Sequence, residues 1–242
     1  MRLSILRCSI LSLLLLAVIP FYKLEAEPLP KAAVYYGPGV CDGCPQSLAK
    51  VIRQAGYDVQ KIHAGEITQE RLKSVNLFAI PGGDDVDELM DDLKPGEAEV
   101  IHNFVAGGGS YLGVCLGAYL ASSDNLNLFK GKIRAHSKTI EARMEIVSWH
   151  GQHRSVYFQD GPEFIASDGD DSDIWSFYKT GEVAALIQNY RSGHVGLVGP
   201  HLEADQSWLD DDHLSDIDGD DSALLVEFIK SIEQSKLISS KK

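Results

Sequence analysis

The sequence has few cysteines, few positive charges and no long apolar run. Four cysteines among 242 residues are too few for a small fold held together by many disulfides. Lys and Arg number 22 against 35 Asp and Glu, which gives a net charge of −13. Such a charge repels phosphate backbones and anionic membrane surfaces, so no nucleic-acid partner is expected. The apolar run over residues 10–19 is shorter than the roughly 20 residues that a membrane-spanning helix needs.

The N-terminal segment has the pattern of a secretory signal peptide. Arg2 and Arg7 precede the apolar run, and the small residue Ala26 ends the polar stretch after it. We therefore expect residues 1–26 to be a signal peptide and the protein to be periplasmic or secreted, with no stable membrane anchor after cleavage; an uncleaved anchor is the alternative. Removal of Arg2, Arg7, Lys23 and Glu25 takes away a charge of +2, so the mature chain has −13 − 2 = −15.

Cysteine positions set a further expectation for the exported chain. Cys8 leaves with the signal, and Cys41, Cys44 and Cys115 remain. Cys41 and Cys44 are three positions apart and, in an oxidising compartment, are expected to form a structural disulfide rather than a redox couple. Cys115 is then the unpaired thiol.

The rest of the chain is predicted to be one α/β domain over residues 27–242. Short apolar β-rich runs alternate with amphipathic helical ones, which is typical of a mostly parallel sheet covered by helices on both faces. The second half is richer in strands, and the acidic residues 168–173 are expected to be a loop. Strands are predicted at residues 32–36, 59–62, 77–80, 111–114, 145–149, 156–158, 183–190 and 195–198, and helices at 46–55, 98–105, 117–122 and 223–231.

Cys115 lies in the pattern of a nucleophile elbow. The segment Gly113-Val114-Cys115-Leu116-Gly117 stands between a β-type run and a helical one. An elbow strains its central residue and leaves no room for side chains at the flanking positions, so glycines suit both. The start of the following helix favours a thiolate and a nearby oxyanion. The competing interpretation is a buried structural cysteine.

A thiol nucleophile needs a base, and the base needs an orienting group. In an extended segment, His201 and Glu203 would point to the same face because they are two positions apart. This pattern predicts that the Glu203 carboxylate orients the His201 imidazole toward Cys115. The rival histidines have no carboxylate two positions later: His136, His150, His153 and His194.

Backbone donors for an oxyanion are expected next to the nucleophile and at the end of a neighbouring strand. Leu116 and the turn at Gly82 and Gly83 fit these positions. The competing interpretation of the glycines is an ordinary tight turn.

No metal or cofactor is predicted. The acidic segment around residues 216–227 has partial calcium-loop spacing, but Asp221 stands where such a loop needs glycine. A solvated helix cap is therefore favoured over a metal site.

Five segments together resemble a known family, and they span nearly all of residues 31–205. Three of them, the PGG turn, YLGVCLGAYLA and GPHLEAD, are in that order similar to the class I glutamine amidotransferase superfamily. The five segments are VYYGPGVCDGC, IPGG, GGGSYLGVCLGAYLA, DGPEF and GPHLEAD. Together they are similar to the biotin-protein ligase N-terminal domain family, including its exported bacterial members. The resemblance implies a flavodoxin-like three-layer sandwich and a Cys-His-Glu triad at Cys115, His201 and Glu203. Leu202 departs from the pattern, because the superfamily usually has proline there.

The family name does not carry an activity. Biotin ligation needs a basic adenylate-binding loop, which this sequence lacks, and amidotransfer needs a synthase partner to receive ammonia. Two hypotheses follow: a cysteine hydrolase acting on an amide-type bond in a small molecule or peptide, and a non-catalytic module that binds a ligand or protein in the same cleft.

Overall fold

A computed structural model of the chain describes residues 28–167 and 171–239. The expected signal peptide, residues 1–26, lies outside the described residues. Within the described part, no helix combines the length and the apolar character that crossing a membrane requires.

One end of the central sheet is parallel. Its strand order, β2-β1-β3-β4-β11, has the flavodoxin-like form, in which the chain starts inside the sheet and winds outward in both directions. Ligands bind such sheets beyond the carboxyl ends of the strands. The parallel strands are β1 (Lys31–Tyr35), β2 (Asp58–Ile62), β3 (Leu77–Ile80), β4 (Ser110–Val114) and β11 (Gly193–Val198).

The other end of the sheet is antiparallel, so the expectation of a mostly parallel sheet holds for one end only. Short connections cause this arrangement, since they join antiparallel neighbours directly. His150 and Gly151, for example, both have positive φ and form a two-residue hairpin turn between β6 and β7. The antiparallel strands are β5 (Gly131–Ala135), β6 (Arg143–Trp149), β7 (Gln152–Phe158), β8 (Pro162–Ala166), β9 (Ser172–Tyr178) and β10 (Val183–Tyr190).

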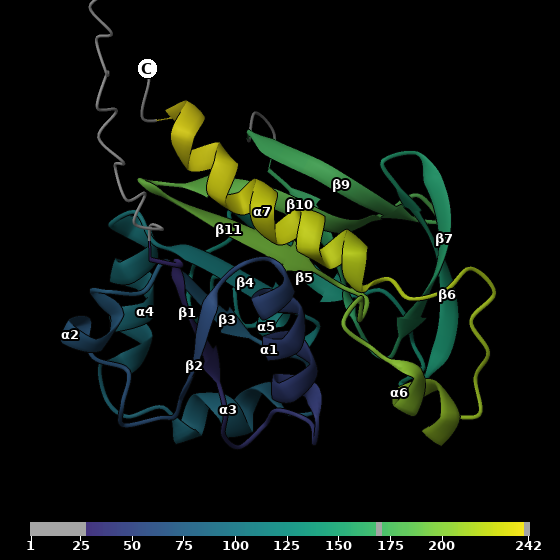
Figure 1. Cartoon of the computed structure of the whole chain (residues 1–242), viewed down its shortest axis with the longest axis horizontal. Helices are drawn as coiled ribbons and strands as arrows, with labels where there is room; N and C mark the ends of the chain where they lie inside the picture. The colour runs from purple at the N-terminus through teal and green to yellow at the C-terminus, as the bar shows by residue number, and fades with distance from the viewer. Residues whose placement is uncertain (1–27, 168–170, 240–242) are drawn as a thin grey trace, which may run out of the picture.

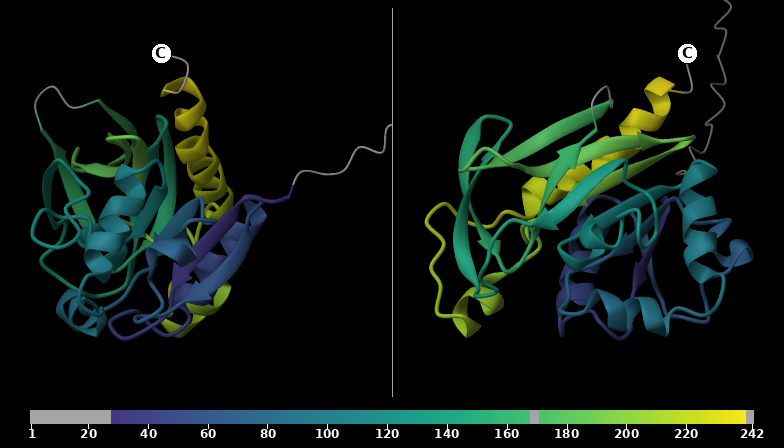
Figure 2. Two further views of the ribbon diagram at one scale, coloured as in Figure 1. Left: turned by 90° about the vertical axis from the view of Figure 1, so that its left-hand side faces the viewer. Right: turned by 180° about the vertical axis from the view of Figure 1, so that it is seen from behind.

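Helices cover both faces of the parallel end, giving three layers (Figures 1 and 2). Alternate residues of β1 face opposite cores: Val34 belongs to the core under α1 and α7, and Tyr35 to the core under α4 and α5. The period of two along a strand produces this division. The helices are α1 (Cys44–Gln54), α2 (Gln69–Leu72), α3 (Val86–Asp92), α4 (Glu97–Ala106), α5 (Leu116–Tyr119), α6 (Gln206–Asp211) and α7 (Ser222–Ser239).

The predicted strands and helices all exist, with ends that differ by a few residues. Short elements were missed: α2, α3, α6, β5, β8 and β9. One loop prediction was partly wrong, because Ser172 and Asp173 of the acidic stretch begin β9 instead of lying in a loop. Pairing with β10 imposes the extended conformation on these two residues.

Cys41 and Cys44 form the expected pair at disulfide distance, with Cα atoms 5.4 Å apart. The bond closes the loop that leads into α1. Loop-closure entropy for so short a loop corresponds to about 2 kcal/mol. We therefore expect Cys41→Ser, at the half-buried position of the pair, to lower the free energy of unfolding by about 2 kcal/mol in urea titrations.

The control for this prediction is the unsubstituted protein under a dithiol reductant. Its unfolding curve should coincide with that of Cys41→Ser. If reduction leaves the curve unchanged while the serine variant is destabilised, the loss comes from the substituted side chain and not from the bond.

Candidate active site

Cys115 occupies a strained turn between β4 and α5. Its φ of 48° and ψ of −106° lie in a region that side chains rarely adopt. The backbone holds the turn, since the Cys115 N–H donates to the Val198 carbonyl at 2.9 Å. A Cβ at Gly113 would collide with the Gly117 carbonyl, and one at Gly117 with the carbonyl of Ile80. The geometry is therefore that of a nucleophile elbow, with glycine required on both sides.

The sheet brings His201 to the same edge as Cys115. β4 and β11 are parallel neighbours, and Val114 is in register with Val198. Cys115 follows one strand directly, and His201 follows the other after two residues. Because the carboxyl ends of parallel strands meet at one edge, both side chains enter the same region.

His201 and Glu203 are paired inside the protein. Nδ1 of His201 lies 3.0 Å from Oε1 of Glu203, and the two residues are only 4% and 3% exposed. The predicted extended conformation of this segment was wrong, however, because residues 202 and 203 form a turn. Buried Leu202 and the hydrogen bond from the His201 N–H to the Tyr157 carbonyl hold this turn.

The His201 imidazole has a strongly perturbed pKa. Burial lowers the pKa, but the negative charges of Cys115 and Glu203, with hydrogen bonds to both side chains, outweigh burial and raise the pKa to about 10. Since Glu203 takes Nδ1, Nε2 is left for the sulfur.

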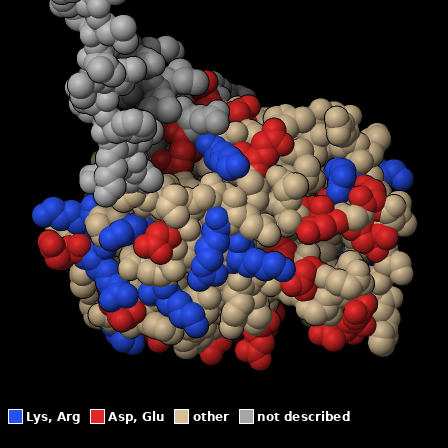
Figure 3. Space-filling view, in the orientation of Figure 1, with Lys and Arg blue, Asp and Glu red and all other residues tan. Residues whose placement is uncertain are grey.

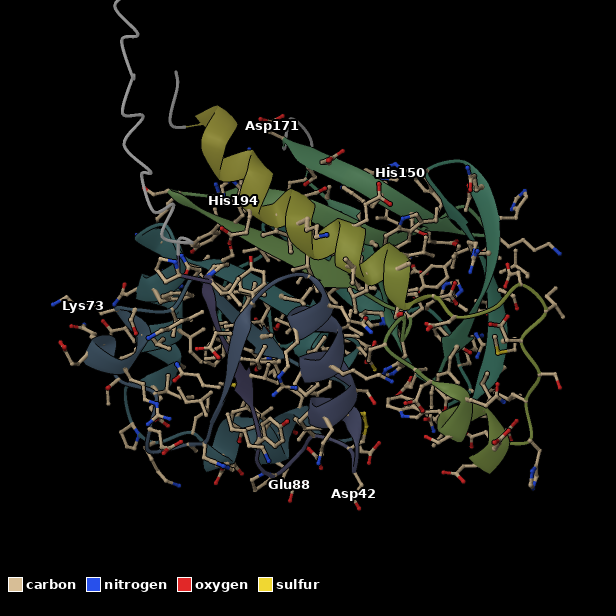
Figure 4. The ribbon with its side chains drawn as sticks, in the orientation of Figure 1. Asp42, Lys73, Glu88, His150, Asp171 and His194 are labelled. Atoms are coloured by element: carbon tan, nitrogen blue, oxygen red, sulfur yellow. A yellow bond between two sulfur atoms is a disulfide. The ribbon has the colours of Figure 1, made fainter. Side chains whose placement is uncertain are left out.

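The rival histidines are engaged elsewhere. His136 pairs with Glu163, and His153 is exposed on β7. His150 forms the hairpin turn, and His194 lies at the opposite end of β11 from His201. Figure 4 shows His150 and His194 in the upper half of the view, away from α6, which follows Glu203.

The proposed oxyanion donors lie around the elbow. The Gly117 N–H donates to the Pro81 carbonyl at 3.1 Å and so joins the PGG turn to α5. Leu116 is the first residue of α5, where a helix offers its N–H no acceptor. Gly83 pairs with Val40, the residue before the disulfide-bonded Cys41, and a Cβ at Gly82 would collide with the His201 ring.

Residues that sequence reasoning missed complete the surroundings of the site. Tyr157 and Trp208 pack on the His201 ring, with ring centroids 5.8 and 5.3 Å away. The Cys115 sulfur lies 3.6 Å from the Gln159 carbonyl, which accepts the thiol proton when one is present. Tyr119 donates to the carbonyl of Asp160, whose φ is 49°. The DGPEF segment was the available signal, since it begins at this strained Asp160.

A cavity of about 610 Å³ opens beside His201, between α6 and the loop before α7. Its walls include His201 and Tyr157 and are rich in carboxylates. Figure 3 shows acidic side chains gathered over this part of the surface, whereas lysines and arginines gather on the opposite side of the view. The acidic wall residues are Asp205, Asp216, Asp220 and Asp221.

Within the described residues, the acidic segment with partial calcium-loop spacing, residues 216–227, makes structural contacts. Arg154 pairs with Asp221 at 2.7 Å and with Asp218 at 3.6 Å. Asp216 and Asp220 accept backbone N–H groups within the segment. Burial raises the pKa of Asp221 to about 6, against the opposing effect of Arg154.

Residues 31–136 match a family model described as biotin-protein ligase, N terminal. The resemblance that the sequence suggested is confirmed over this range, which contains Cys115 but not His201 or Glu203. No curated protein matches the chain significantly.

Solved structures show an amidotransferase-like fold for the chain. A candidate component of GMP synthase from Thermoplasma acidophilum is 18% identical with a TM-score of 0.60, covering 90% of this chain and 100% of its own. A glutamine amidotransferase from Thermotoga maritima is 14% identical with a TM-score of 0.54, covering 86% and 92%. A candidate ThuA-like protein from Bacteroides uniformis is 12% identical with a TM-score of 0.59, covering 87% and 95%. At these identities the likeness concerns the fold alone.

Proposed function

We propose that this protein is a cysteine hydrolase that cleaves an amide-type bond in a small molecule or peptide. The observation that carries the proposal is the buried His201, whose Nδ1 lies 3.0 Å from Oε1 of Glu203, at the sheet edge where the strained turn of Cys115 also lies. A candidate nucleophile, its base and the group that orients the base thus meet at one edge of the sheet.

The proposed reaction has two halves. Nε2 of His201 takes the thiol proton, and the Cys115 sulfur attacks the carbonyl carbon of the amide. The N–H groups of Leu116 and Gly83 hold the oxyanion, and the imidazolium then protonates the leaving amine. In the second half, His201 removes a proton from water, which attacks the thioester and releases the acid with a free thiol.

The reaction is placed outside the cytoplasm in this proposal. The N-terminal apolar segment and the pairing of Cys41 with Cys44 support export. Biotin ligation is not proposed, because the matched family model concerns the N-terminal part of such ligases.

A non-catalytic binding module is the second candidate. It is favoured by one observation: Cys115 is only 4% exposed, and its sulfur faces the Gln159 carbonyl. A ligand held beside His201 would then leave the thiol unmodified.

Trapping of an acyl-enzyme separates the two candidates. The full chain is incubated with amide substrates that carry positive, neutral or negative groups, since the cavity beside His201 is lined with aspartates. We expect intact mass spectrometry to show the mass of the acyl group on Cys115, and hydroxylamine to remove it. Cys115→Ser is the control and should give no hydroxylamine-labile thioester. Ligand binding without any adduct or released amine would support the binding module instead.

A further inference from the structure

A second group of ligand-type side chains lies outside the proposed nucleophile site, where β5, β8 and β10 meet. His136 follows β5, Glu163 belongs to β8, and Glu182 immediately precedes β10. One ligand atom from each of the three residues lies within 4.8 Å of the others. The chemistry proposed for Cys115 uses none of them.

One oxygen of this group has no hydrogen-bond partner among the described residues. It is Oε2 of Glu182, which is shielded from solvent although the residue as a whole is partly exposed. A buried acceptor without a donor costs free energy and points to a missing ion or water. Arg134 pairs with Oε1 of Glu163, so the two carboxylates of the group share one guanidinium.

The distances suit a metal ion. Nδ1 of His136 lies 3.0 Å from Oε2 of Glu163. Two ligand atoms that are each about 2.1 Å from a metal are about 3.0 Å apart at a right angle and about 3.4 Å apart at a tetrahedral angle. An ion can therefore replace the proton between these atoms with little movement.

The surroundings hold the ligands in place. The His136 ring stacks on Tyr178 with centroids 3.6 Å apart and an angle of 6° between the planes. The backbone N–H of His136 donates to the Gly161 carbonyl, and Arg134 fixes the other oxygen of Glu163. The side chains of His136 and Glu163 are 8% and 6% exposed. Locked side chains with satisfied outer contacts are what a preorganised metal site requires.

We propose that His136, Glu163 and Glu182 bind one divalent transition-metal ion, with Zn²⁺ as the ion that fits best. One imidazole and two carboxylates suit Zn²⁺, whereas Ca²⁺ and Mg²⁺ take all-oxygen sites. Three protein ligands leave a fourth position open for water or an anionic ligand. The proposal does not depend on the function proposed for Cys115.

The test uses the full chain carrying Cys115→Ser, which removes the thiol as a competing metal ligand. The protein is stripped with a chelator, dialysed without reductant, and titrated with Zn²⁺ by calorimetry; elemental analysis counts the bound ions. We expect one ion per chain and a higher Tm on binding. Glu182→Gln and His136→Ala should each weaken Zn²⁺ binding about 100-fold or more, exceeding the effect of losing an outer contact.

Further measurements keep the test decisive if a variant folds poorly. Glu182 is partly exposed and immediately precedes β10, so Glu182→Gln is expected to keep the fold, which circular dichroism checks. His153→Ala, at an exposed histidine, is the matched control and should bind Zn²⁺ normally. Co²⁺ bound to the chain with Cys115 restored should show no sulfur-to-cobalt charge-transfer band. Absence of binding, unchanged affinity in Glu182→Gln, or a sulfur-to-cobalt band would overturn the site.

Discussion

Replacing His201 with asparagine is expected to make alkylation of Cys115 steeply dependent on pH. In the wild type, the imidazolium paired with the sulfur stays protonated, because the charges of Cys115 and Glu203 raise the pKa of His201 to about 10. The proposed hydrolase holds the sulfur beside this imidazolium, so the alkylation rate is expected to change less than about twofold between pH 6 and 8. Without the imidazolium, an ordinary thiol with a pKa near 8.5 remains, and the rate should rise about 75-fold over the same range.

The measurement is the rate of iodoacetamide modification at Cys115, followed by peptide mass spectrometry. His153→Asn is the control, because this exposed histidine on β7 is the matched substitution away from the sulfur. It should retain the flat profile of the wild type. A wild-type profile as steep as that of His201→Asn would mean that Cys115 is an ordinary thiol, and the hydrolase would have to be abandoned for the binding module.

Gly117→Ala is expected to destabilise the whole domain. A Cβ at this position would collide with the Ile80 carbonyl, which is backbone and cannot turn aside like a side chain. The shift would also strain the hydrogen bond from the Gly117 N–H to the Pro81 carbonyl. Overpacking of this kind costs about 3 kcal/mol, which lowers the Tm of a domain of this size by about 6 to 12 °C.

Thermal unfolding followed by circular dichroism measures the effect. The matched control is Gly107→Ala at the end of α4, where φ is −84° and the nearest atom to a Cβ, the Asn103 carbonyl oxygen, is 3.1 Å away. The free energy of unfolding should fall by less than about 1 kcal/mol in this variant. Equal losses in both variants would show that the close approach of α5 to β3 does not limit the elbow.

Much of the parallel end of the fold was predictable from local pattern. Buried strands such as β3 read as short apolar runs, and the glycines after α4 mark where that helix ends. The antiparallel end was harder. Its strands β5, β8 and β9 lack a clear alternation, and partner strands determine their extended form.

The candidate sites differ in the same way. The nucleophile elbow was visible because its residues are consecutive, and the pairing of His201 with Glu203 was visible at a separation of two. His136, Glu163 and Glu182 are far apart along the chain, so no local sequence motif predicts that they form a group. Gln159 and Tyr157 were likewise missed, because their contacts with Cys115 and His201 join segments 44 positions apart.

The sequence by itself determined that Cys115, His201 and Glu203 are candidates for chemistry and that glycine must flank Cys115, because these inferences depend on neighbouring residues. Only the tertiary structure decided that β4 and β11 lie side by side with Val114 opposite Val198. That pairing joins segments more than 80 positions apart along the chain, and it depends on burial of both strands between two helical layers. It brings Cys115 and His201 to one edge of the sheet, where the carboxyl ends of parallel strands converge.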